Sequence, residues 1–296
     1  MIDFVRIYYR DKQRFENYVM SEQRFQEVDC VLGYHTGEVK YPYKANIENM
    51  EIIITEKVGY VLGSLHKFYN SWKTGVEQNY NDFTYSNLIA VIDYLSLRIL
   101  DFENTPLTQL EVGLNLDLYF SPKIFLERNV LFHNLKRINL DKKYKGGGKM
   151  LQYDYSQYYV KIYDKGKMYR QKENILRFEI KLIRKKIIQN NGVFTISDLR
   201  NKEILKELFE LLLEKFDEML IIDDYREKNI DEKDLQPLQK YTNSRFWMVE
   251  LKNKTRTTKA NHSRKLNALL LKYDLSNLKS SLKLQLIQKY NHFINN

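Results

Sequence analysis

The sequence contains little cysteine, proline or glycine: of 296 residues, one is Cys, four are Pro and 11 are Gly. A lone Cys30 excludes a disulfide framework and a multi-cysteine zinc site, which is typical of a reducing compartment. The scarcity of Pro and Gly argues against a long disordered linker. No apolar run approaches the ~20 residues that cross a bilayer, and no signal-peptide core is visible. We therefore expect a cytoplasmic protein with no membrane partner.

Positive charge and aromatic rings are abundant. Lys and Arg number 48 against 38 Asp and Glu, which gives a net charge of +10, so polyanions such as nucleic acids are the expected partners. The 23 Tyr and 15 Phe also supply rings on which unpaired bases stack, although most aromatic residues in proteins lie in the core. Because many proteins are basic, local motifs must decide the function.

Apolar alternation and helical spacing predict an α+β fold, with an antiparallel sheet, helices packed on one face, and a mostly helical C-terminal region. Strands are expected at residues 3–9, 50–55, 110–120, 158–163 and 175–182. Helices are expected at residues 86–100 and 124–135, then from a cap at Asn201, and at 245–252, 263–271 and 278–293. This division predicts an α+β domain over residues 1–190, in an N-terminal βα half and a catalytic half, and a helical DNA-binding region over residues 191–296.

The strands at 158–163 and 175–182 form a predicted hairpin with one polar face. That face carries Tyr159, Lys161, Tyr163, Arg177, Glu179 and Lys181. If the strand at 110–120 joins the same sheet with its leucines in the core, it adds Glu111, Asn115 and Asp117 to the polar face. Carboxylates and a tyrosine therefore converge.

Carboxylate oxygens are what a hard divalent ion requires, so Glu111, Glu179 and Asp117 are the predicted ligands of Mg²⁺ or Mn²⁺. Such an ion polarises a phosphodiester and neutralises charge on its oxygens. Tyr163 is the predicted nucleophile. We expect Lys165 and Lys167 to lower the pKa of its phenol from the usual ~10 and to stabilise the transition state.

At these residues the chain resembles a known family. Tyr163-Asp164-Lys165 after a strand, followed by the strand Leu176-Arg177-Phe178-Glu179-Ile180-Lys181, is similar to the tyrosine motif and the Arg-Phe-Glu strand of filamentous-phage replication initiators and plasmid initiation factors. Leu110-Glu111-Val112 stands where that family usually has Arg-Ile-Asp. The segment 243–247 resembles a short Phe-Trp motif near the family's C-terminal end. The resemblance spans roughly residues 49–275.

The resemblance implies a nickase core of the HUH or RRM-like type and rolling-circle replication of a phage or plasmid. Its tyrosine would attack one strand of a single-stranded or supercoiled origin, giving a 5′-phosphotyrosine link and a free 3′-OH. Reversal would rejoin the displaced strand, and a host helicase and polymerase would be partners. The chain departs from the family in having Glu111 for aspartate, and it lacks the paired histidines with which many related nicking enzymes bind metal.

Basic residues near the motif and in the C-terminal region are the expected DNA contacts, because Lys and Arg neutralise phosphates. They are Lys161, Lys167, Arg177, Lys181, Lys252, Lys254, Arg256, Lys259, Arg264 and Lys265. For the last six, a solvated charged face is the structural alternative.

Other interpretations remain open at this point. The chain can be a non-enzymatic DNA-binding protein, which needs the basic residues but not Tyr163, or a mobilisation relaxase, which uses the same chemistry. Glu179 can be a cross-strand salt-bridge partner of Lys161 or Arg177. His133, on the helix expected at 124–135, is more typical of a packing residue than of a metal ligand.

Overall fold

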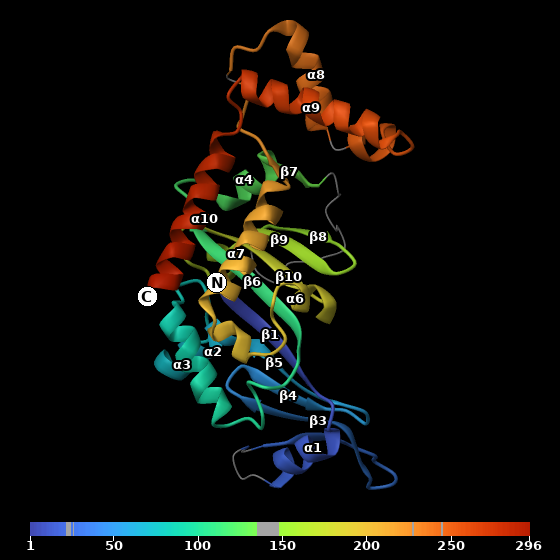
Figure 1. Cartoon of the computed structure of the whole chain (residues 1–296), viewed down its shortest axis with the longest axis vertical. Coiled ribbons are helices and arrows are strands. Elements are labelled where there is room, and N and C mark those ends of the chain that lie inside the picture. Colours follow the sequence, from blue (N-terminus) through green and yellow to red (C-terminus); the bar gives the residue numbers. More distant parts are fainter. Residues whose placement is uncertain (22–24, 26, 135–147, 227, 244) are drawn as a thin grey trace.

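A computed structural model describes residues 1–21, 25, 27–134, 148–226, 228–243 and 245–296. Its core is a nine-stranded antiparallel sheet in the order β2-β3-β4-β5-β1-β6-β10-β9-β8, and β7 pairs with β11 in a separate two-stranded sheet (Figure 1). The predicted α+β class, with a helical C-terminal region, is confirmed.

The strands predicted from alternation are β1, β4, β6, β9 and β10, with small differences at their ends. The strands are β1 Ile2–Tyr9, β2 Asp29–Leu32, β3 Val39–Ile47, β4 Met50–Ile54, β5 Gly59–Ser64, β6 Leu107–Asp117, β7 Val130–His133, β8 Met150–Asp154, β9 Tyr158–Asp164, β10 Ile175–Leu182 and β11 Met219–Ile221. In β6, Leu110, Val112 and Leu116 are fully buried, so one face of the central sheet lies in the core.

Helices flank the sheet, and two of them cover its apolar face. The helices are α1 Lys12–Ser21, α2 Leu65–Thr74, α3 Tyr85–Ser96, α4 Pro122–Arg128, α5 Lys165–Met168, α6 Lys185–Asn190, α7 Lys202–Asp217, α8 Glu232–Thr242, α9 Arg256–Lys272 and α10 Asn277–Asn295, with a 3₁₀ turn at Ser197–Arg200 and a π turn at Phe246–Glu250. Phe216 of α7 packs edge-on against Phe178 of β10, with ring centroids 5.2 Å apart. Tyr290 of α10 stacks on Phe209 of α7 at 4.0 Å. These two helices therefore seal the apolar side of the central strands.

Helix α7 begins where the sequence predicts. The Asn201 side chain accepts a hydrogen bond from the Glu203 amide (2.9 Å), which satisfies one of the amides left free at the helix start. Leu205, Leu208 and Leu212 of α7 are fully buried in the main core.

A second, smaller core lies among α8, the π turn and α9, which extend from the sheet in Figure 1. Trp247 and Phe246 are buried there, and the Trp247 indole donates to the Tyr241 carbonyl (2.7 Å). The Phe-Trp motif thus has a packing role in this core. The domain boundary predicted at residue 190 stays a prediction.

The prediction of a helix over residues 124–135 is wrong for the second half of that range. Helix α4 ends at Arg128, and Val130–His133 instead forms β7, paired with β11. Asn129 and Ile222 hold the junction, since the Asn129 side chain donates to the Ile222 carbonyl (2.8 Å) and the Ile222 amide donates to the Asn129 carbonyl (3.0 Å). A distant partner strand decides the structure of this short apolar run. Among the described residues, no helix is long and apolar enough to span a membrane.

Candidate functional site

The strand pairing places the predicted tyrosine and carboxylates on one face. Glu179 of β10 lies opposite Lys161 of β9 on one side and opposite Gly113 of β6 on the other, and Arg177 lies opposite Tyr163. Residues that are opposite each other in an antiparallel pair project to the same side of the sheet. The predicted shared face of Tyr163, Glu179 and Glu111 is therefore confirmed.

Tyr163 lies at the centre of this face. Its hydroxyl donates a hydrogen bond to Glu179 Oε2 (3.2 Å), and Lys165 Nζ donates to the same hydroxyl oxygen (3.4 Å). Lys165 is the first residue of α5, a short helix that starts because Asp164 accepts from the Lys167 amide (2.9 Å). Tyr163 is 6% and Lys165 1% exposed, so both polar groups depend on partners within the chain.

The expected lowering of the phenol pKa by lysines is wrong for this arrangement. Burial raises the pKa of Tyr163 well above its usual value, and the charge of Glu179 adds to this effect. Lys167 is exposed. Burial, together with the nearby Arg177, lowers the pKa of Lys165 to about 8. The phenol is thus protonated at neutral pH and hydrogen-bonded to Glu179.

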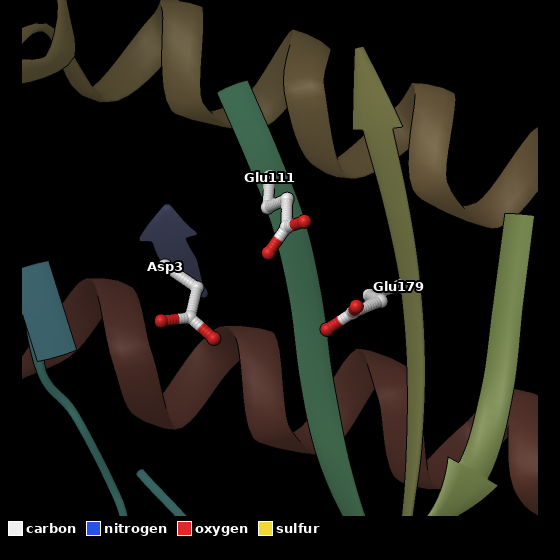
Figure 2. A group of neighbouring side chains, drawn as sticks. All are labelled: Asp3, Glu111 and Glu179. Atoms are coloured by element: carbon white, nitrogen blue, oxygen red, sulfur yellow. The ribbon is translucent and has the colours of Figure 1, made fainter. Parts of the chain in front are cut away.

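Three carboxylates meet on this face. Figure 2 shows Asp3, Glu111 and Glu179 directed toward one another from β1, β6 and β10. One ligand oxygen from each lies within 4.8 Å of the others. Three hard oxygen donors this close fit a divalent ion of the Mg²⁺ or Mn²⁺ type, so the buried triad can hold a metal.

Asp3 is a member that the sequence analysis missed. By alternation it belongs with the buried residues Val5 and Ile7. The pairing of β1 with β6 runs from Ile2↔Val112 to Val5↔Leu110, so three steps along β1 match two along β6. This register shift places Asp3 beside Glu111 instead of in the apolar core. An alternation pattern carries no signal for such a shift.

Gly113 makes room for Glu179. A Cβ atom at position 113 would lie 2.4 Å from the Glu179 Cβ and 2.8 Å from the Phe178 carbonyl oxygen. No side chain fits there without moving the strand or the glutamate. The glycine therefore permits the close approach of Glu179 to β6.

Cations of the chain lie among these carboxylates. Lys161 Nζ is 3.0 Å from Glu111 Oε1 and 2.8 Å from Glu179 Oε1. Arg177 Nε is 2.6 Å from Glu179 Oε2 and its Nη2 is 2.9 Å from Asp3 Oδ2. Burial alone would raise the pKa of Glu179, but Lys161 and Arg177 outweigh it and hold that pKa below its usual range. Lys181 Nζ also lies 3.2 Å from Glu111 Oε1. Each of the three carboxylates is therefore ion-paired with at least one cation of the chain.

A segment between α2 and α3 closes one side of the site. The Asn79 side chain donates to Asp3 Oδ2 (2.7 Å), and the Tyr169 hydroxyl donates to Asn79 Oδ1 (2.7 Å). Asn115 of β6 donates to the Tyr80 carbonyl (3.0 Å), and the Ser64 hydroxyl donates to Asp3 Oδ1. Asn115 was predicted on this face, whereas Asn79, Tyr169 and Ser64 were not predicted there, since their contacts join segments far apart in the sequence.

Asp117 lies away from the triad. It is 70% exposed and pairs with Lys289 of α10 (3.0 Å). It shares a face of β6 with Glu111, but six residues of strand separate them by roughly 20 Å at ~3.3 Å per residue. The structure does not bring this predicted ligand to the site.

The predicted DNA contacts fall into two groups. Arg177 is 3% exposed, and its guanidinium donates to Glu179, Asp3 and Asn115, so in this structure it organises the site and presents no surface to DNA. Lys161 and Lys181 face the carboxylates. Lys252, Lys254, Arg256, Arg264 and Lys265 are exposed in and before α9, and Lys259 is half-buried. For these six, DNA binding stays a prediction.

His133 has a structural environment. It is fully buried in β7, with Nδ1 2.6 Å from the Tyr155 hydroxyl and Nε2 3.0 Å from the Lys215 carbonyl. Burial lowers its pKa to about 4. The ring is therefore a neutral packing residue outside the site.

Comparisons with known proteins give one structural match. No family model matches the chain, and no curated protein does. The structure matches that of a rolling circle replication initiator protein from Geobacillus stearothermophilus with a TM-score of 0.40 and 12% sequence identity, over 80% of this chain and 90% of that chain. At this level of similarity no residue role is transferred from that protein.

Proposed function

We propose that this chain is a DNA-nicking enzyme that starts rolling-circle replication, with Tyr163 as its nucleophile. The observation that supports it most is the position of the Tyr163 hydroxyl, 3.2 Å from Glu179 and 3.4 Å from Lys165, on the face that carries Asp3 and Glu111. A nucleophile beside both a proton acceptor and a cation, next to a metal-type donor set, is suited to attack on a phosphodiester.

In the proposed step the Tyr163 oxygen forms a bond to phosphorus and the bond from phosphorus to the 3′ oxygen breaks. The phenol proton leaves along its existing hydrogen bond to Glu179 and passes on to solvent, and the departing 3′ oxygen takes a proton from solvent to become a 3′-OH. Lys165 donates to the tyrosine oxygen and stabilises negative charge as it develops there. Reversal, in which a 3′-OH attacks the phosphotyrosine, rejoins the strand.

Asp3, Glu111 and Glu179 would hold the divalent ion. When bound, Mg²⁺ or Mn²⁺ would polarise the phosphodiester and offset the charge by which Glu179 raises the phenol pKa. Arg177 keeps Asp3 and Glu179 in place from the buried side, since it contacts both. Asp117 is not part of this proposal.

The proposed substrate is one strand of origin DNA. The net charge of +10 and the exposed basic residues of the segment 252–265 favour a polyanion. We assign the cutting chemistry to residues 1–190 and DNA binding to residues 191–296, the division predicted from the sequence. Host helicase and polymerase would act on the 3′-OH that the cut releases.

A covalent-adduct assay tests this proposal. Purified chain is incubated with a random-sequence single-stranded DNA library and Mn²⁺, and DNA-linked protein is separated on a denaturing gel. The wild type is expected to form an adduct and Tyr163→Phe none. Tyr159→Phe is the matched control, because Tyr159 lies on the same strand and face, and it is expected to keep the adduct. An undiminished adduct in Tyr163→Phe would place the nucleophile elsewhere.

A non-enzymatic DNA-binding protein is the second candidate. The exposed basic residues of the segment 252–265 favour it, because Lys252, Lys254 and Arg256 are all open to solvent. Salt-dependent DNA binding by a wild type that forms no adduct under any metal condition would support this candidate over the nickase.

A further inference from the structure

The Lys161 ammonium lies between two carboxylates of the triad, 3.0 Å from Glu111 Oε1 and 2.8 Å from Glu179 Oε1. Carboxylates this close repel each other unless a cation separates them. Lys161 therefore supplies, from within the chain, the positive charge that the gap between Glu111 and Glu179 requires.

A different cation holds the buried side of the triad. Arg177 bridges Glu179 Oε2 (2.6 Å) and Asp3 Oδ2 (2.9 Å), and its Nη1 donates to Asn115 Oδ1 (3.0 Å). The guanidinium is a planar fork, and here its three donors are fixed by three side chains. With 3% exposure, Arg177 belongs to the permanent frame of the site.

Lys161 is less constrained than Arg177. Its side chain is 16% exposed and that of Glu111 is 12% exposed, against 3% for Glu179. The ammonium ends a flexible four-carbon stem, so rotation of the side chain can carry it toward solvent while β9 stays in place. Of the two cations, Lys161 is the one that another cation can replace.

We propose that the Lys161 ammonium occupies the position of the divalent ion between Glu111 and Glu179 while no metal is bound, and that Mg²⁺ or Mn²⁺ enters the triad by displacing this ammonium. This rests on the metal role of the triad in the proposed function. An ion that takes oxygens from both carboxylates needs the gap that Lys161 fills, and two cations in that gap repel each other. Lys181 contacts Glu111 (3.2 Å) and lies opposite it in the strand pairing, whereas Glu179 lies opposite Gly113, so Lys181 can stay.

This exchange has a consequence for the metal-free chain. Because Lys161, Arg177 and Lys181 together balance the three carboxylates, the triad stays assembled before any ion binds. Metal loading then turns the Lys161 ammonium outward on the polar face of the sheet, where it becomes free to contact a phosphate.

Calorimetric titration of the full chain with Mn²⁺ alone, without DNA, tests the proposal. Lys161→Met removes the competing charge and keeps the length of the side chain, so it is expected to bind Mn²⁺ roughly tenfold more tightly than the wild type. Lys181→Met is the matched control, because it also removes a cation from Glu111, and its gain is expected to be clearly smaller. Wild-type affinity in Lys161→Met, or an equal gain in both variants, overturns the proposal.

A second measurement needs no variant. The wild type is treated with an amine-acetylating reagent with and without saturating Mn²⁺, and each lysine is quantified by mass spectrometry. Displacement predicts a several-fold rise in Lys161 acetylation with Mn²⁺ and little change at Lys181. Unchanged or reduced labelling of Lys161 in the Mn²⁺-bound chain overturns the proposal.

These readouts separate this inference from the proposed function. The expected Mn²⁺ differences together with no DNA adduct support Lys161 displacement and reject the nickase. An adduct together with equal Mn²⁺ affinity in wild type and Lys161→Met rejects displacement alone. If no form of the chain binds Mn²⁺, displacement is rejected together with the metal role of the triad.

Discussion

The Tyr163 hydroxyl donates to Glu179 Oε2 across two paired strands, at 3.2 Å. The two residues are diagonal neighbours, since Tyr163 lies opposite Arg177 and Glu179 lies opposite Lys161. Diagonal contacts of this kind are within reach of an aromatic side chain. The contact joins the proposed nucleophile to a carboxylate of the triad, and burial with the charge of Glu179 raises the pKa of the phenol. The resting site therefore keeps its nucleophile protonated until substrate and metal change that environment.

Gly113→Ala is expected to destabilise the chain by about 1–3 kcal/mol, because overpacking of a well-packed position forces its neighbours to move. The added Cβ would lie 2.4 Å from the Glu179 Cβ. Urea denaturation measures the change. Gln109→Ala, on the same face of β6, is the control and is expected to change stability less. Equal stabilities of Gly113→Ala and wild type would contradict the proposed close approach.

Arg177→Met is expected to cost about 3–5 kcal/mol, since it leaves Glu179 and Asp3 charged and buried without their partner. Arg184→Met removes an exposed arginine and is expected to stay within about 0.5 kcal/mol of wild type. Urea denaturation at pH 7 measures both changes in the free energy of unfolding. A cost below about 1 kcal/mol for Arg177→Met would show that the guanidinium does not hold the two carboxylates.

Acid is expected to destabilise the chain partly through His133. Burial lowers the folded-state pKa of His133 to about 4, whereas an unfolded histidine titrates near ~6.5. Between these values only the unfolded chain binds the proton. The contribution of His133 to the free energy of unfolding is therefore fully present above pH ~6.5, and it falls by up to about 1.4 kcal/mol per pH unit as the pH drops toward 4. His133→Gln should show a shallower slope in this window than wild type. His35→Gln, at an exposed position, should keep the wild-type slope. Identical slopes in the wild type and both variants would show that His133 does not cause the acid sensitivity.

The basic residues near α9 are expected to set the salt dependence of DNA binding. Replacing Lys252, Lys254 and Arg256 by Gln should reduce the slope of log K against log salt by about 2, at ~0.7 for each lost phosphate contact on a single strand. Fluorescence anisotropy across a salt series measures it. Replacing Lys57, Lys123 and Lys206, which are exposed elsewhere, changes the net charge equally and should leave the slope nearly unchanged. Equal slopes in both triple variants would contradict DNA binding by this segment.

Alternation along strands predicted the face of the site but not its full membership. It placed Tyr163, Glu179 and Glu111 together because a period of two fixes the side of a sheet. It gave no distance along a strand, so Asp117 was grouped with Glu111 although the two lie at different places on β6. Asp3 was missed because a register shift reverses its side. The phenol pKa was also predicted in the wrong direction, since Tyr163 is buried in the folded chain and no local pattern shows that burial.

The most direct test of the central claim is the identity of the residue that becomes linked to DNA. Adduct from wild-type chain, Mn²⁺ and single-stranded DNA is digested with nuclease and protease, and the modified peptide is sequenced by mass spectrometry. A 5′-phosphate of a nucleotide on Tyr163, absent from Tyr163→Phe and retained in Tyr159→Phe, is the predicted result. A link to another residue, or an adduct of unchanged yield in Tyr163→Phe, would contradict the assignment of Tyr163 as the nucleophile.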